Sequence, residues 1–459
     1  MIRIHTNHSH QRDIYEITKV FFPGEDLVFD EPADLVSLVD GDGVETRLDI
    51  DGYKRKNALK LRDFPVFEVL GHAESKALRY SLYTCLRDKK DLPWGMLMGV
   101  RLGKLARQIM DKGLDLEEIL VKYFFLSEDR ARLLKDINLV QEPIINKYKD
   151  GYSLYVNIPF CPSICSYCSY PVLRLGGSER LVPAYVDRVL EEIDYVYKAY
   201  GRPSMAYIGG GTPSAIGRGQ LEKIVDKVLS LGDLDGFTVE IGREDTIDED
   251  MLRMLDGRAD RICINPQTMV DKTTKSLGRL QSSQGVIRAY ELSRKYGFTI
   301  NMDTIIGLPG EGLEDIKYTF DSLTRLAPEN ITVHSLALKK GSDLRDMAYE
   351  HGERIEGLMD RAKESLKESS YRPYYIYRQK DIGGALENLG YAKTGFESAY
   401  NIVSMEESQT IIGVGMGAVS KFILDGRPTR ASNFRSMDDY MNRFDEVLDK
   451  KNPEKLFKG

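Results

Sequence analysis

From Tyr152 onward, short apolar runs typical of strands alternate with segments of helical periodicity, and this alternation restricts the possible fold more than any other feature of the chain. Strand and helix in repeated alternation are the pattern of βα units, which build a parallel sheet. Six such units predict an α/β fold, a partial (β/α)6 barrel, whose chemistry gathers at the carboxyl ends of the strands. The expected strands are 154–158, 205–208, 237–241, 261–264, 299–306 and 331–336, and the expected helices are 183–200, 220–231, 248–255, 285–296 and 314–326.

The sequence on either side of this pattern predicts two further parts. Residues 1–145 hold short alternating runs followed by helical patterns over 73–87 and 116–140, which predict a small α+β domain of unknown role. The barrel is expected over residues 146–345. Residues 346–459 are expected to be a C-terminal extension packed on the barrel, with a polar helix at 354–368, a tyrosine-rich run at 371–378, a glycine-rich segment at 413–420 and a charged helix from Asp438.

Charge, apolar runs and cysteine usage exclude several classes of protein. The formal net charge is -7, so no nucleic-acid partner is expected from a general positive field. No apolar run reaches the roughly 18 residues of a membrane span, and the N-terminus has no apolar signal segment, so we expect a cytoplasmic protein without a membrane span. Cys85 and Cys263 stand alone in apolar stretches, which does not resemble a disulfide framework and fits a reducing compartment.

Three cysteines follow the first expected strand, in the loop Cys161-Pro-Ser-Ile-Cys165-Ser-Tyr-Cys168. Buried core cysteines, half of a zinc site and a disulfide pair are the competing interpretations. A core does not need three cysteines so close together beside two prolines, and a structural zinc site normally has a second Cys or His pair nearby. Iron–sulfur clusters are held by cysteine thiolates, usually four. Three thiolates leave one iron open, so the loop predicts a [4Fe-4S] cluster whose open iron binds S-adenosylmethionine.

A glycine run, Gly209-Gly-Gly-Thr-Pro213, follows the second expected strand. Three glycines let the backbone approach a ligand closely, and we expect their amide N–H groups to be free to bind a carboxylate. A glycine turn after a strand is common by itself. Its position one βα unit after the cysteine loop makes this glycine run a specific indication of a ligand-binding site.

Together with Tyr155-Val-Asn-Ile-Pro-Phe-Cys161, these motifs resemble the radical S-adenosylmethionine (radical SAM) family of oxygen-independent coproporphyrinogen III oxidases (dehydrogenases). The resemblance extends from about residue 150 to 435. The long N-terminal domain and the stretches 94–101 and 377–380 resemble the HemZ-type branch in particular. The further matches, in order, are Thr238-Val-Glu240, Asn265-Pro-Gln267, Leu277-Gly-Arg279, Asn301-Met-Asp303 and Gly307-Leu-Pro309.

The resemblance implies a role for each matching residue. The three cysteines bind the cluster, and Tyr155 is the catalytic candidate beside the first S-adenosylmethionine. That molecule also contacts Gly210, Glu240 and Val419. In the family a second S-adenosylmethionine lies beside the first, and the positions that match its contacts are Tyr167, Gly211, Thr212, Gln267, Arg279, Asp303 and Ala337.

The activity that the resemblance implies is the oxidative decarboxylation of coproporphyrinogen III to protoporphyrinogen IX, a step of porphyrin and haem biosynthesis. The expected cofactors are a [4Fe-4S] cluster and one or two molecules of S-adenosylmethionine. The expected partners are the tetrapyrrole substrate, an electron donor and an electron acceptor, of which the last two are unidentified. We expect a monomer.

Two residues depart from the family pattern. The oxidase has a histidine where this chain has Asn157, whose amide does not titrate near neutral pH, and a further cysteine where this chain has Tyr170. The family's helical C-terminal lid is expected to be shortened or absent. Two alternatives stay open for these reasons: a haem chaperone that keeps the cluster but delivers haem, and a radical methyltransferase that acts on a tetrapyrrole.

Overall fold

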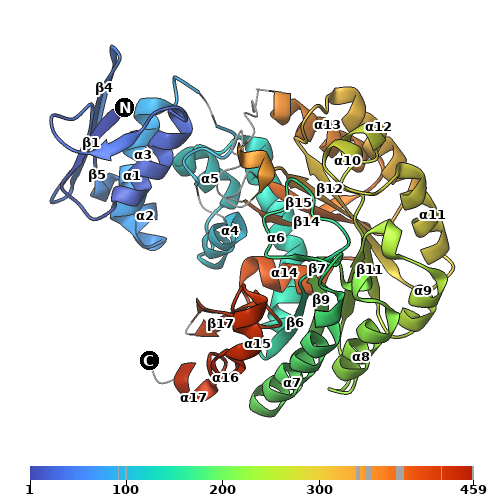
Figure 1. Ribbon diagram of the computed structural model, residues 1–459. Helices are drawn as coiled ribbons and strands as arrows, with labels where there is room; N and C mark the ends of the chain where they lie inside the picture. Colours follow the sequence, from blue (N-terminus) through green and yellow to red (C-terminus); the bar gives the residue numbers. More distant parts are fainter. Residues whose placement is uncertain are drawn as a thin grey trace. The chain divides into compact units, whose positions relative to one another are not determined.

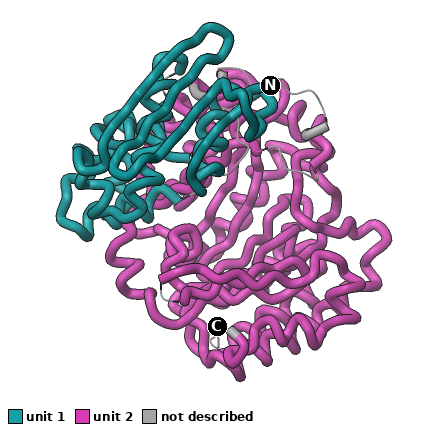
Figure 2. Tube along the Cα trace, turned by 90° about the vertical axis from the view of Figure 1, so that its left-hand side faces the viewer, with its two compact units in different colours: residues 1–139 teal, residues 140–459 magenta. Residues whose placement is uncertain are grey.

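The structure is a computed structural model that describes residues 1–90, 92–98, 101–337, 342–346, 354–378, 387–424 and 426–456. These residues divide into two compact units, 1–139 and 140–459 (Figure 2). The division falls within helix α6 (Glu128–Tyr148). Among the described residues, no helix combines the length and the apolar character that a bilayer crossing requires.

The first unit contains a five-stranded sheet, counted over its described residues, in the order β2-β1-β3-β4-β5. The strands of this sheet are β1 (Ile2–Thr6), β2 (Leu27–Phe29), β3 (Leu35–Asp40), β4 (Gly43–Ile50) and β5 (Tyr53–Lys60). The helices of the unit are α1 (Gln11–Phe21), α2 (Pro65–Val69), α3 (Ala73–Leu86), α4 (Leu102–Asp111) and α5 (Leu116–Phe124), followed by the start of α6. Along β4, Val44, Thr46, Leu48 and Ile50 are buried in strict alternation, because α3 packs on that face.

The single helical pattern expected over 116–140 is wrong, because two helices occupy this stretch. Helix α5 ends at Phe124 since Phe125 adopts a left-handed backbone conformation with φ of 60°, and α6 begins at Glu128. The apolar spacing on both sides of the break is helical, so periodicity alone does not reveal it.

The second unit is built on one sheet, which has eleven strands within the described residues. Six neighbouring strands at its centre are parallel, which confirms the predicted partial barrel. These strands are β6 (Tyr152–Ile158), β9 (Met205–Gly210), β10 (Phe237–Gly242), β11 (Arg261–Ile264), β12 (Thr299–Ile306) and β13 (Asn330–Ser335).

Helices follow the barrel strands in sequence and cover the outer face of the sheet (Figure 1). They are α7 (Val182–Tyr200), α8 (Arg218–Leu229), α9 (Glu249–Leu255), α10 (Asp271–Ser276), α11 (Ser283–Ser293), α12 (Leu313–Leu326) and α13 (Arg354–Glu368). On β6 the fully buried Leu154, Val156 and Ile158 alternate with Tyr155 and Asn157, which therefore face the barrel interior.

The C-terminal residues continue the same sheet at both of its edges. Strands β15 (Asn388–Ala392) and β14 (Arg372–Tyr377) follow β13, and β16 (Thr410–Val414) pairs parallel with β6, followed by β17 (Val419–Leu424) and β18 (Arg427–Ser432). The glycine-rich segment therefore lies beside the first barrel strand. Helix α14 (Ala399–Glu406) connects β15 to β16.

The charged helix expected from Asp438 is three short helices. These are α15 (Met437–Asn442), α16 (Phe444–Asp449) and α17 (Pro453–Leu456). Arg443 separates the first two because its backbone, at φ -116° and ψ 38°, is not helical. Residues 99–100 and 379–380, in the two stretches that resemble the HemZ-type branch, lie outside the described residues.

Candidate active site

The three predicted cluster cysteines follow the carboxyl end of β6: Cys161 ends β7 (Phe160–Cys161), and Cys165 and Cys168 lie between β7 and β8 (Leu173–Arg174). All are free thiols, two of them buried. The amide of Ser166 donates to the carbonyl of Leu277 at 3.0 Å, which ties the loop to the segment after α10. The loop is therefore held against the end of the barrel.

Two side chains donate hydrogen bonds to the cysteine sulfurs. Thr212 Oγ1 lies 3.5 Å from Cys161 Sγ, and Arg279 Nη1 lies 3.8 Å from Cys165 Sγ. Burial raises the pKa of the Cys161 thiol to about 11, so iron must displace a proton to bind there. Donors aimed at the sulfurs and a nearby guanidinium suit an anionic thiolate-bound cluster. The residues present therefore fit a [4Fe-4S] group.

A single metal ion fits this segment less well. Among the described residues, no three Cys, His, Asp or Glu side chains are placed to hold one ion together. A four-iron cluster binds each thiolate through a different iron, so it takes ligands that are farther apart.

The glycine run brings β9 close to the cysteine loop. A Cβ atom at Gly211 would lie 2.6 Å from the Phe160 carbonyl oxygen and 2.8 Å from Cys161 Sγ. The expectation that the glycine amides are free is wrong for Gly211, whose N–H donates to the Ile158 carbonyl at 2.7 Å. The N–H of the next residue, Thr212, donates to the Phe160 carbonyl at 2.8 Å. The glycines are needed for close packing against the first strand.

Asn157 links Tyr155 to the glycine-rich C-terminal segment. The Tyr155 hydroxyl donates to Asn157 Oδ1 at 3.0 Å, and Asn157 Nδ2 donates to the Met416 carbonyl at 2.6 Å. A Cβ at Gly210 would lie 2.4 Å from the same Asn157 Oδ1, and Gly210 has a φ of 119°. An amide can donate and accept at once, which explains why Asn157 serves as the connection here.

Glu240 stands on β10 with two donors to its carboxylate. Tyr207 donates its hydroxyl to Oε2 at 3.1 Å, and Asn265 Nδ2 donates to Oε1 at 2.7 Å. Burial raises the pKa of Glu240 to about 7, and the charge of Asp303 adds to the rise. The carboxyl group therefore titrates near neutral pH.

Gln267 is held in a backbone conformation that non-glycine residues rarely adopt, with φ of 65°. Its N–H donates to the Asp303 carbonyl at 2.9 Å and its carbonyl accepts from Ile305 at 2.8 Å, so the neighbouring strand β12 imposes this conformation. The side-chain Oε1 is buried without a hydrogen-bond partner in the described part of the chain. A strained residue with an unpaired buried oxygen indicates a place for a ligand.

Arg279 joins the cysteine loop to the end of β11. Nη1 also donates to the Tyr167 hydroxyl at 3.2 Å, Nε donates to Gln281 Oε1 at 2.8 Å, and Nη2 donates to the Asn265 carbonyl. The guanidinium is buried. Arg279 and Tyr167 are thus brought together with the cluster cysteines.

Ala337 and Val419 are not joined to the other predicted contacts by any hydrogen bond among the described residues. Ala337 follows the end of β13, and Val419 begins β17, where it pairs with Ser432. Asp303 does lie beside another predicted contact, because its carbonyl accepts the Gln267 N–H, and its Oδ1 accepts from Asn301 Nδ2 at 2.7 Å.

The sequence analysis did not identify His334 on β13. Its Nε2 lies 3.8 Å from Asp303 Oδ2, and its Nδ1 lies 3.1 Å from the Tyr377 hydroxyl oxygen. The signal for it is the parallel register, in which His334 pairs with Ile305 and therefore faces the same side as Asp303.

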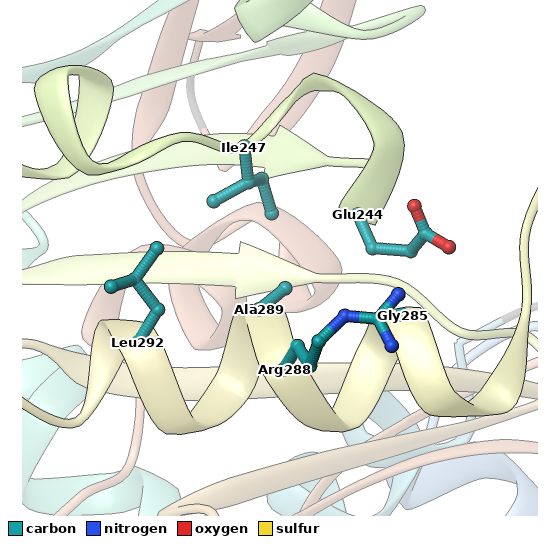
Figure 3. Close-up of a pocket in the computed structure, with 6 residues that line it drawn as sticks. All are labelled: Glu244, Ile247, Gly285, Arg288, Ala289 and Leu292. Atoms are coloured by element: carbon teal, nitrogen blue, oxygen red, sulfur yellow. The ribbon is translucent and has the colours of Figure 1, made fainter.

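A small pocket lies outside this site, between the segment after β10 and helix α11 (Figure 3). Its walls are Glu244, Ile247, Gly285, Arg288, Ala289 and Leu292. Glu244 Oε1 accepts the backbone N–H of Ser282 at 3.0 Å, which stabilises the start of α11.

A model of the Radical SAM superfamily matches residues 155–323. The chain is also 32% identical to the oxygen-independent coproporphyrinogen-III oxidase-like protein HemZ of Bacillus subtilis, across 98% of this chain and 96% of that protein. The chain belongs to the HemZ family of radical SAM proteins. Radical SAM proteins use a [4Fe-4S] cluster and S-adenosylmethionine, so the predicted cofactors of this HemZ-family chain are confirmed.

Other relatives of the HemZ-family chain have different names. The heme chaperone HemW of Lactococcus lactis is 29% identical over 58% of this chain and 68% of its own length. Among solved structures, coproporphyrinogen III oxidase (HemN) from Escherichia coli has a TM-score of 0.55 at 19% identity, over 68% of this chain and 73% of that chain. The HemN likeness confirms the predicted fold class.

Proposed function

We propose that this protein catalyses the oxygen-independent oxidative decarboxylation of coproporphyrinogen III to protoporphyrinogen IX. The observation that carries the proposal is the near full-length match to a coproporphyrinogen oxidase-like relative. The gathering of the cysteine loop, Glu240, Gln267 and Asp303 at one end of the barrel supports it, because barrel enzymes act at the carboxyl ends of their strands.

In this proposal Cys161, Cys165 and Cys168 hold the cluster, and Tyr155, Gly210, Glu240 and Val419 bind the first S-adenosylmethionine. The bound cofactors supply a 5′-deoxyadenosyl radical. The carboxylate of Glu240 would accept from a ribose hydroxyl or an ammonium group, with Tyr207 and Asn265 holding its orientation. If a second S-adenosylmethionine binds, its contacts are Tyr167, Gly211, Thr212, Gln267, Arg279, Asp303 and Ala337.

Each vinyl group formed requires the loss of one hydrogen atom, one carbon dioxide and one electron from a propionate. An electron donor for the cluster and an acceptor for the substrate electron are therefore part of the proposed reaction. The five free thiols support a reducing, cytoplasmic setting, and we propose a monomer.

The test is anaerobic reconstitution of the protein with iron and sulfide, followed by incubation with coproporphyrinogen III, S-adenosylmethionine and a reductant. We expect carbon dioxide, methionine and 5′-deoxyadenosine in amounts that depend on the substrate, and a tetrapyrrole with the mass of protoporphyrinogen IX. Cleavage of S-adenosylmethionine that the tetrapyrrole neither stimulates nor couples to decarboxylation would contradict the proposal.

A haem chaperone is the second candidate function. The similarity to HemW favours it, as does Asn157, which occupies the position of the oxidase histidine and is fully engaged with Tyr155 and Met416. Titration of the purified protein with haem, followed by absorbance, distinguishes the two functions. Tight stoichiometric binding without turnover would favour the chaperone.

A further inference from the structure

The two ring nitrogens of His334 differ in their contacts: only Nδ1 lies within hydrogen-bond distance of a neighbour among the described residues. Nδ1 is 3.1 Å from the Tyr377 hydroxyl oxygen, a normal hydrogen-bond distance. Nε2 is 3.8 Å from Asp303 Oδ2, which is close enough for an ion pair but too long for a hydrogen bond. The side chain of His334 is 26% exposed, so part of the imidazole is open to solvent.

Neighbouring strands fix the direction in which this imidazole points. Asp303 pairs with Thr332 and Ile305 pairs with His334, so the carboxylate and the imidazole share the interior face of the sheet. Burial opposes ionisation of Asp303, but His334 and the hydrogen bond from Asn301 hold the pKa of the carboxyl below its ordinary value. Asp303 is therefore a carboxylate at neutral pH, and it faces the imidazole.

A tetracarboxylate substrate requires hydrogen-bond donors in the interior of this barrel. Asp303 and Glu240 both place acidic groups there: in addition to burial, the charge of Asp303 raises the pKa of Glu240, and both groups raise the pKa of Tyr207. Arg279 uses its guanidinium for Tyr167, for a cysteine sulfur and for groups at the end of β11. When the Tyr377 hydroxyl donates to Nδ1, the ring hydrogen is on Nε2, so His334 presents an N–H donor on the interior face of the sheet.

We propose that the Nε2–H of His334 binds a propionate carboxylate of the tetrapyrrole substrate, with Asp303 and Tyr377 fixing the orientation of the imidazole. The inference rests on the proposed function, because it takes its ligand from that reaction. It adds a substrate contact on β13 that no residue of the cysteine or glycine motifs provides. The propionate has to be ionised, because only the carboxylate leaves as carbon dioxide. A carboxylate accepts hydrogen bonds, so a donor at Nε2 suits it.

Two substitutions test the two ring nitrogens of His334 independently. In His334→Asn the amide nitrogen reaches the place of Nδ1 and can keep the Tyr377 contact, but nothing replaces Nε2. In His334→Gln the longer side chain brings its amide nitrogen near the place of Nε2. The two variants are therefore matched controls for each other, and His5→Gln in the first unit is a control for loss of a histidine elsewhere.

The experiment measures the binding of coproporphyrin III and of its tetramethyl ester to the full, anaerobically reconstituted protein with S-adenosylmethionine, by porphyrin fluorescence. We expect His334→Asn to weaken binding of the free acid about tenfold or more, since it loses a hydrogen bond to a charged group. We expect a smaller loss for His334→Gln, no change for His5→Gln, and no effect of any substitution on the ester.

The outcomes separate this inference from the proposed function. The His334 contact would be overturned if His334→Asn bound the free acid as tightly as the wild-type protein does, or if it bound the acid and the ester with an equal loss. This holds even if the wild-type protein decarboxylates coproporphyrinogen. The expected binding contrast without any release of carbon dioxide would support the contact and overturn the proposed decarboxylation. A wild-type protein that neither binds coproporphyrin nor releases carbon dioxide from coproporphyrinogen III overturns both.

Discussion

Single side chains at the strand ends decide how the candidate site is assembled. Gly211 has to lack a Cβ because the Phe160 carbonyl and Cys161 Sγ occupy that space. Asn157 has to both donate and accept because Tyr155 and Met416 lie on its two sides. The residue types at these positions therefore follow from contacts to backbone and sulfur atoms as much as from contacts to a ligand.

Gly211→Ala tests the close approach of β9 to the cysteine loop. The added methyl group would meet a backbone oxygen at 2.6 Å, so we expect Cys161 to be displaced and the reconstituted protein to hold less than about half of the wild-type iron. Iron and sulfide content and the visible absorbance of the cluster are the measurements.

The control for this substitution is Gly219→Ala in α8, where a Cβ has no neighbour within 4 Å. Alanine in a helix is more favourable than glycine by up to about 1 kcal/mol, so the control should keep its full iron content with unchanged or slightly raised stability. Equal iron content in the two variants would contradict the steric explanation.

Glu240 makes the stability of the protein depend on pH. Its folded pKa is raised to about 7, mainly by burial, whereas an unfolded glutamate titrates near about 4.3. Between these values the folded state holds a proton that the unfolded chain has lost, so the free energy of unfolding falls as pH rises toward 7 and does not change through this group above it.

Glu240→Gln removes this contribution, because glutamine has no proton to lose. We expect the free energy of unfolding of the variant, relative to wild type, to rise by about 1–3 kcal/mol between about pH 5 and about pH 8. Urea denaturation of the cluster-free protein at the two pH values measures it. Wild-type and variant curves that shift in parallel with pH would show that Glu240 does not titrate in this range.

At the scale of elements, a buried ion pair joins α7 to the C-terminal helices. Glu192 on α7 and Lys451 after α16 lie 2.7 Å apart, and their side chains are 0% and 1% exposed. Glu192 Oε2 also accepts from the Gly415 amide at 2.8 Å and from the Tyr440 hydroxyl at 2.7 Å. The pair thus fixes the glycine-rich segment that contacts Asn157.

Lys451→Met should destabilise the protein by about 3–5 kcal/mol, because it leaves the Glu192 carboxylate buried without its cation. The double variant Glu192→Gln with Lys451→Met should recover part of this loss. Chemical denaturation provides the free energies.

The exposed pair of Arg253 with Glu249 on α9 is the matched control, with side chains 64% and 59% exposed. Arg253→Met should change the free energy of unfolding by no more than about 0.5 kcal/mol. A loss for Lys451→Met as small as that for Arg253→Met would mean that the buried pair does not hold the C-terminal helices in place.

At the scale of the whole molecule, the sequence predicts the parts that local patterns determine. The limits of β11 and β12 agree with the predicted 261–264 and 299–306, because each is a short run rich in β-branched residues, with polar residues or glycine close to each end. The cysteine motif likewise places the candidate site at the end of β6. These features depend on residues that are adjacent in the chain.

Contacts between distant segments are harder to predict. The glycine-rich segment pairs with β6 although some 250 residues separate them, and the contact of His334 with Tyr377 depends on β14 and β13 lying on either side of β15. Strand pairing depends on neighbours that a local window does not contain, so the sequence alone indicates neither contact. Asn157, which the sequence analysis treated only as a missing histidine, has a connecting role for the same reason.

The central claim is that a radical formed at the cysteine loop removes hydrogen from a propionate of coproporphyrinogen III, and isotope transfer tests it most directly. The substrate is deuterated on the propionate carbon next to the ring and incubated anaerobically with the reconstituted protein, a reductant and S-adenosylmethionine. We expect deuterium in the 5′-deoxyadenosine product and a vinyl group on the tetrapyrrole. Unlabelled 5′-deoxyadenosine, together with an unchanged tetrapyrrole, would contradict the claim.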